Sequence, residues 1–84
     1  MKSNYSINRK IRLIWDFHGG DAQGTAEHHL KHIVQFMERE KLETLRTSVQ
    51  SANEEHFMAC LTVNEKDVII LRDTLKPNRA LVVE

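Results

Sequence analysis

The chain has 84 residues, 29% of them charged, which is the size of one small domain and too short for two independent hydrophobic cores. Twelve basic and twelve acidic residues give a formal net charge of zero, so no overall charge favours nucleic acid or an anionic membrane as a partner. No run approaches the roughly 20 apolar residues of a membrane-spanning helix.

The small size also bears on assembly and location. A monomer of this length buries only about 60% of the surface that its unfolded chain exposes, and self-association often supplies the missing stability. The single cysteine, Cys60, cannot form an internal disulfide, and no apolar secretory segment follows Met1. We therefore expect a cytoplasmic homodimer.

Residues 1–9 are polar and lack periodicity, so we expect a flexible N-terminal segment before a single domain over residues 10–84. Apolar and polar side chains alternate over residues 10–18, which predicts a half-buried strand with a core side formed by Ile11, Leu13, Trp15 and Phe17. Ile14 is the exception, because it is an apolar residue on the otherwise polar side.

A glycine-rich turn follows the first strand. Gly19, Gly20 and Gly24 favour a tight turn; the motifs of phosphate-binding loops are absent, and Asp21 would repel a phosphate. Apolar residues at helical spacing then predict a helix over residues 25–42, capped by Thr25 or Asp21.

The second half of the chain predicts a helix over residues 65–76 and strands over residues 45–52, 56–63 and 79–84. The first of these strands is polar, which suits an edge position, whereas the second alternates as a central strand does. Asn64 favours a helix start and Pro77 a helix stop. Three consecutive β-branched residues leave a strand over residues 67–72 as the alternative.

The order strand, helix, strand, strand, helix, strand resembles the ferredoxin-like split βαβ arrangement over about 75 residues. The resemblance is to a fold and not to a family. It implies an α+β sandwich whose four-stranded antiparallel sheet has the order 4-1-3-2 and carries both helices on one face.

Side-chain parity then assigns the open face of the sheet. It receives residues from the first and third strands, namely Arg12, Ile14, Asp16, His18, His56, Met58, Cys60 and Thr62. Since the end of one strand lies beside the start of the other, His18 and His56 should meet. The apolar middle of the face predicts a homodimer interface formed by Ile14, Met58, Cys60 and Val82.

The same face is also a candidate catalytic pocket for a small-molecule ligand. His18, His56 and Asp16 would be its acid-base groups, since histidine exchanges protons near neutral pH. Cys60 cannot act as a nucleophile with His56, because four residues of strand separate them by about 13 Å. Cys60 is better interpreted as a free, half-buried cysteine that acts as a small hydrophobic residue.

Three histidines near the start of the predicted first helix suggest a metal site. His28 and His32 form a pair four residues apart that could chelate zinc, nickel or copper, with His18 or Asp21 as a third ligand, whereas His29 turns toward the core. Neither an HExxH motif nor a cysteine-containing zinc pattern is present, which favours solvated histidines and no cofactor.

RNA binding through the open face would need outward aromatic side chains on the two central strands. Trp15, Phe17 and Phe57 share the parity of the core residues, so this pattern disfavours a nucleic-acid partner. We therefore predict a binding or regulatory module of unknown ligand that self-associates through its open sheet face. The alternatives are a small dimeric α+β-barrel-type enzyme using His18 and His56, and a transition-metal-binding protein.

Overall fold

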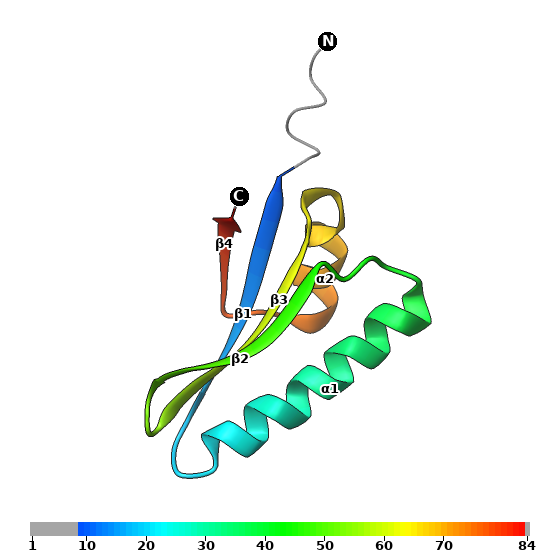
Figure 1. Cartoon of the computed structure of the whole chain (residues 1–84). Coiled ribbons are helices and arrows are strands. Elements are labelled where there is room, and N and C mark those ends of the chain that lie inside the picture. The colour runs from blue at the N-terminus through cyan, green and yellow to red at the C-terminus, as the bar shows by residue number, and fades with distance from the viewer. Residues whose placement is uncertain (1–8, 84) are drawn as a thin grey trace.

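The computed structural model describes residues 9–83 as a four-stranded antiparallel sheet with two helices (Figure 1). The sheet order is β2-β3-β1-β4, which is the predicted order. The elements are β1 (Lys10–His18), α1 (Ala22–Glu40), β2 (Arg46–Asn53), β3 (His56–Asn64), the 3-10 turn η2 (Glu65–Asp67), α2 (Val68–Leu75) and β4 (Arg79–Val83).

Most of the expected N-terminal segment, residues 1–8, lies outside the described residues, as does Glu84. Arg9 is described, and it is bound to the start of η2. Its carbonyl accepts a hydrogen bond from the Glu65 N–H at 3.0 Å, and its guanidinium pairs with the Glu65 carboxylate at 3.1 Å.

Helix α1 begins three residues before its predicted start and ends two residues before its predicted end. It starts early because Ala22 and Ala26 are buried, so the first turn already packs against the protein. Thr25 is therefore inside the helix, where its hydroxyl donates to the Asp21 carbonyl at 3.0 Å, and no side chain caps the start. The helix ends at Glu40, because the next residue, Lys41, has a left-handed conformation in which its N–H bonds back to the last turn.

The predicted helix over residues 65–76 divides into η2 and α2, and the alternative of a strand over residues 67–72 is wrong. Leu71 is fully buried, whereas Ile69 and Ile70 are exposed, so only one side of the β-branched run meets the core. Lys76, in the left-handed conformation, ends the helix immediately before Pro77.

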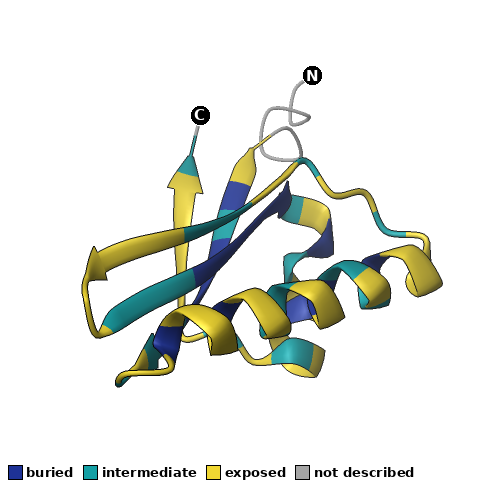
Figure 2. Cartoon of the chain, turned by 60° about the horizontal axis from the view of Figure 1, so that its bottom comes forward, coloured by how far each residue is buried: buried dark blue, intermediate teal, exposed yellow. Residues whose placement is uncertain are grey.

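One hydrophobic core lies between the sheet and both helices. Buried residues gather along the central strands β1 and β3, whereas β2 and β4 are mostly exposed (Figure 2). The cluster joins one side of β1 and β3 to both helices through Ile11, Leu13, Trp15, Ala26, Ile33, Met37, Ala59, Leu61, Val63 and Leu71. Both helices therefore cover the same sheet face. Trp15 points inward, as predicted, and its Nε1–H donates to the Leu75 carbonyl at 2.8 Å.

Candidate functional site on the open sheet face

The register of β1 and β3 sets the order of side chains on the open face. Thr62, Cys60, Met58 and His56 stand opposite Arg12, Ile14, Asp16 and His18, as parity predicts. By the same alternation, the outer strands add Arg46, Ser48, Gln50, Arg79, Leu81 and Val83 to this face.

The predicted position of Val82 on the open face is wrong. Strand β4 begins with Arg79 opposite Ile14, so Val82 stands opposite the core residue Ile11 and lies on the helix-covered side. Leu81, 47% exposed, takes the open-face position that the sequence assigned to Val82.

The apolar middle of the open face is buried, although no helix of the described chain covers it. Ile14 is only 4% exposed and Cys60 3% exposed. Arg79 stands opposite Ile14, and its guanidinium lies 3.1 Å from the Met58 sulfur. Long side chains of the sheet itself therefore cover this region, where another protein would have a second layer of helices or strands. The exposed patch that Ile14 and Cys60 were expected to provide for a dimer is therefore not present.

Cys60 is consistent with a structural thiol. Burial raises the pKa of the Cys60 thiol, and a hydrogen bond involving Ser48 together with the nearby Arg12 charge offsets this only in part. A thiol with a raised pKa supplies little thiolate near neutral pH.

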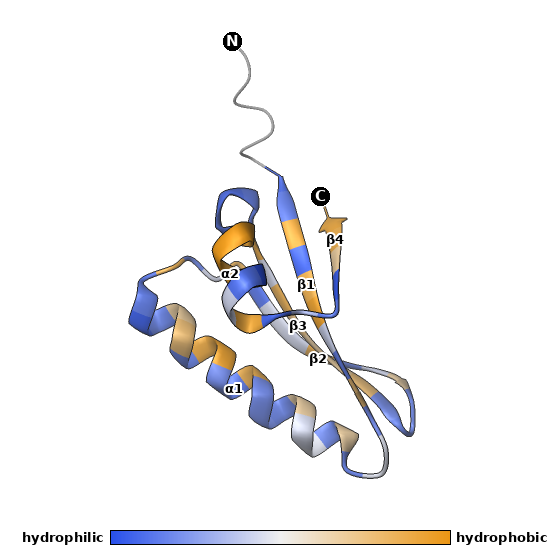
Figure 3. Ribbon diagram, turned by 180° about the vertical axis from the view of Figure 1, so that it is seen from behind, coloured by the Kyte–Doolittle hydropathy of each residue, from blue (hydrophilic) through white to orange (hydrophobic). Residues whose placement is uncertain are grey.

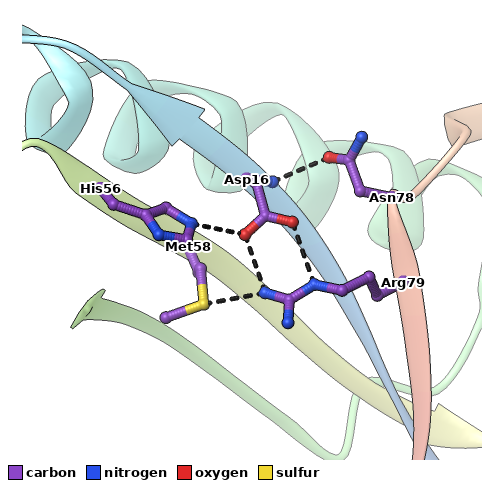
Figure 4. Close-up of polar contacts among 5 residues, drawn as sticks. All are labelled: Asp16, His56, Met58, Asn78 and Arg79. Atoms are coloured by element: carbon purple, nitrogen blue, oxygen red, sulfur yellow. Dashed lines mark hydrogen bonds and ion pairs between the residues drawn. The ribbon is translucent and has the colours of Figure 1, made fainter.

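Asp16 is the centre of a polar network on this face (Figure 4). Its carboxylate accepts two hydrogen bonds from the Arg79 guanidinium, at 3.1 Å and 2.8 Å, and lies 2.7 Å from His56 Nε2. Its backbone N–H donates to Asn78 Oδ1 at 2.8 Å. The Asp16 side chain is only 15% exposed, so these contacts replace most of its water.

Two opposing effects set the protonation of Asp16. Burial raises the pKa of the carboxyl group. The hydrogen bonds from His56 and Arg79, together with the charges of these two residues, lower it by a larger amount, so the net pKa is below the ordinary 3.8. Asp16 is therefore ionised near neutrality and only accepts hydrogen bonds. In the 2.7 Å contact, His56 Nε2 therefore carries the hydrogen and donates it to the carboxylate.

His18 joins the network by stacking on His56, with ring centroids 4.2 Å apart and ring planes 21° apart. The structure thus brings the three predicted catalytic residues, His18, His56 and Asp16, together. Sequence reasoning missed Arg79 and Asn78 as members of the network. Arg79 was visible as a cation just after Pro77, but only the register of β4 shows that it meets Asp16.

A basic hollow lies at the other end of the open face. Arg12 and Arg46 stand opposite Thr62 on its two neighbouring strands, and Lys10 is the next open-face residue on β1. These residues, with Leu45 and Val83, line a hollow of about 280 Å³. Within residues 9–83, none of the three cations forms an ion pair.

The helical histidines form a separate group. The Nε2 atoms of His28 and His32 lie 3.0 Å apart on the exposed side of α1. His29 instead packs edge-on against Trp15 and Phe17, at centroid distances of 5.5 Å and 5.4 Å. Burial, followed by the charges of His32 and His28, lowers the pKa of His29, and its buried Nε2 has no partner among the described residues.

The predicted metal site with His18 as third ligand does not assemble. His18 stacks on His56 at the end of the sheet, because β1 carries it away from the exposed side of α1. In residues 9–83 no three side chains of histidine, cysteine, aspartate or glutamate gather in a way that could hold a metal ion. Only the His28 and His32 pair remains.

Two further hollows border α1. One, of about 510 Å³, lies at the helix start and is lined by Gly20, Asp21, Gln23, Gly24, Thr25 and His28. It has an aspartate and no lysine or arginine in its lining, so it gives no support to a phosphate-binding turn. The other, of about 350 Å³, is lined by Glu27, Leu30, Lys31, Val34, Gln35 and Val49.

Neither helix within residues 9–83 combines the length and the apolar composition that crossing a membrane requires. No protein-family model matches the chain, and no curated protein or solved structure shows a significant similarity to it.

Proposed function

We propose that the protein is a binding module with a ferredoxin-like fold, and that its open sheet face binds a small oxyanion such as a phosphate or carboxylate group. The observation that carries the proposal is the convergence of Lys10, Arg12 and Arg46 around Thr62. No ion pair within the described residues neutralises these three cations.

Charge segregation supports this function despite the net charge of zero. Arg12 and Arg46 flank Thr62 of β3, so their backbones are separated by about two strand spacings of 4.8 Å, and all three residues line the same hollow. Neighbouring cations repel one another, and a bound anion relieves this repulsion. Guanidinium groups also suit oxyanions because they donate paired hydrogen bonds.

The lining of the hollow fits a small polar ligand. Thr62 is buried, and its hydroxyl can donate to an oxyanion or accept from a neighbouring cation. The Glu43 carboxylate accepts a hydrogen bond from Asn64 Nδ2 at 2.9 Å and is not part of the lining. A volume of about 280 Å³ is near the lower limit for small-molecule sites, which favours a compact anion.

The Asp16 network supports a binding function more than a catalytic one. The Asp16 carboxylate already accepts from Arg79 and contacts His56, so it is not free to take a substrate proton. His18, His56 and Asp16 also line none of the three hollows described above. We infer that the network shields Ile14 and neutralises Arg79, which confines the unpaired positive charge to the Thr62 end.

Titration of the isotope-labelled protein with inorganic phosphate, pyrophosphate and citrate at low ionic strength tests the proposal. We expect backbone NMR shifts centred on Arg12, Thr62 and Arg46 that weaken as salt is added. Arg12→Gln and Arg46→Gln should each reduce the affinity about tenfold or more, because each removes a charge-assisted contact of about 1.5–3 kcal/mol.

Arg72→Gln is the matched control, since Arg72 is exposed on α2 and, among the residues that the structure describes, pairs only with its neighbour Asp73 at 3.3 Å. It should leave the affinity unchanged. An equal loss of anion affinity in Arg12→Gln, Arg46→Gln and Arg72→Gln would mean that binding depends only on the overall charge of the protein. The absence of localised NMR shifts in the wild type would refute the site.

A specific observation also favours the homodimer, though not through Ile14. Within residues 9–83, strand β4 pairs with β1 alone, and after Arg79 it forms a hydrophobic edge of the sheet (Figure 3). Leu81 and Val82 are exposed on opposite faces of this strand, and such an unprotected edge favours pairing with a second chain. A dimeric mass at micromolar concentration that becomes monomeric in Leu81→Lys would support this; a monomeric wild type would refute it.

A further inference from the structure

We propose that His28 and His32 form a two-histidine chelate for one divalent late transition-metal ion, on the exposed side of α1 and separate from the open sheet face. The two side chains direct the same atom, Nε2, at one another across one helical turn, at 3.0 Å. Their rings are nearly perpendicular, with an interplanar angle of 80° and centroids 4.5 Å apart.

The nitrogen separation matches that of two ligands on a single ion. With metal-nitrogen bonds of about 2.0–2.1 Å, two imidazole nitrogens lie roughly 2.8 Å apart in square geometry and roughly 3.4 Å apart in tetrahedral geometry. The observed 3.0 Å lies between these values, so the ion can enter with small rotations of the rings.

The pair must rearrange its hydrogens to bind a metal. At 3.0 Å one Nε2 carries a hydrogen and donates it to the lone pair of the other. A metal ion that binds both Nε2 atoms needs this hydrogen on Nδ1 of the same ring, which is a change of tautomer without net loss of a proton. A doubly protonated ring must lose one proton first, so metal binding weakens in acid.

The surroundings leave the other coordination positions open. His28 borders the hollow of about 510 Å³ at the helix start, and a side chain at Gly24, one turn earlier, would meet nothing within 4 Å. His29 does not compete for the ion, since it packs against Trp15 and Phe17. Water or an added ligand then completes the coordination. Two imidazoles favour copper(II) over nickel(II) and zinc(II).

Metal titration of the full chain, prepared without a histidine tag, tests the proposal at slightly alkaline pH. We expect calorimetry with Cu²⁺, Ni²⁺ and Zn²⁺ to show one ion per chain, with copper bound most tightly and with a raised melting temperature. His28→Gln and His32→Gln should each weaken binding at least about tenfold. Each variant leaves one histidine nitrogen, so the ion loses the second ligand that the same chain supplies at high effective concentration. Far-UV circular dichroism confirms that both variants fold.

His18→Gln is the matched control and should bind the metal as the wild type does. Equal affinity in the wild type, His28→Gln and His32→Gln would overturn the proposal, as would a comparable loss in His18→Gln. The test is independent of the proposed anion site, because Arg12→Gln should lose the anion and keep the metal.

Discussion

Replacement of Asp16 by asparagine should destabilise the protein by about 2 kcal/mol. The change removes a charge that accepts two hydrogen bonds from Arg79 and one from His56, and hydrogen bonds to charged groups contribute about 1.5–3 kcal/mol each. The total is reduced because the Arg79 side chain is 48% exposed, so water replaces part of its interaction, and because asparagine keeps one acceptor oxygen.

Chemical and thermal unfolding followed by circular dichroism measure this effect. For a domain of this size, about 2 kcal/mol corresponds to a fall of about 8–16 °C in melting temperature. The difference between wild type and Asp16→Asn should also depend on pH. Well above pH 3.8 the carboxyl group is ionised in both the folded and the unfolded chain, and its contribution to stability is complete.

As the pH falls below 3.8, the unfolded chain takes up a proton before the folded chain does, because the folded pKa is lowered. The contribution of Asp16 is then lost, and the two proteins should converge in stability. Asp73→Asn is the control, since Asp73 is exposed and its one ion pair in the described part of the chain is with Arg72; it should cost less than about 0.5 kcal/mol. Equal effects of the two substitutions, or no convergence in acid, would refute the reasoning.

Three further outcomes follow from single residues. The buried thiol of Cys60, whose pKa is raised, should react slowly with iodoacetamide in the folded protein and rapidly in urea; equal rates would contradict its burial. Trp15→Phe should cost about 1–2 kcal/mol in urea unfolding, because the Leu75 carbonyl loses its donor, and an unchanged midpoint would argue against that bond. Gly19→Ala should cost about 1 kcal/mol because Gly19 has a φ of +112°, whereas Gly20→Ala should be close to neutral; equal melting temperatures would count against the strained turn.

The elements with regular periodicity could be predicted closely. The strand over residues 10–18 has its predicted bounds, because the alternation, which only Ile14 interrupts, favours the register that buries Leu13 and Trp15. Helix ends were less predictable. Burial of Ala22 and the left-handed conformation of Lys41 decide where α1 starts and stops, and both depend on the packing of the helix and on the chain that follows it.

Some residues of the candidate sites could be predicted from the sequence and others could not. The contact between His18 and His56 could be predicted, because it follows from the antiparallel pairing of two adjacent strands. The role of Arg79 could not, because a shift of one residue in the register of β4 exchanges the two faces of that strand. This shift also explains why Val82 was assigned to the wrong face.

The sequence by itself determined the order of the elements, the inward side of the central strands and the pairing of the two histidine-bearing strand ends, since these depend on local periodicity and on antiparallel geometry. Only the tertiary structure decided that Ile14 is buried and that Lys10, Arg12 and Arg46 converge on Thr62. Both features depend on how far long side chains reach across neighbouring strands. The amino-acid composition gives no information on these side-chain positions, and a net charge of zero does not show that cations lie close together on one part of the surface.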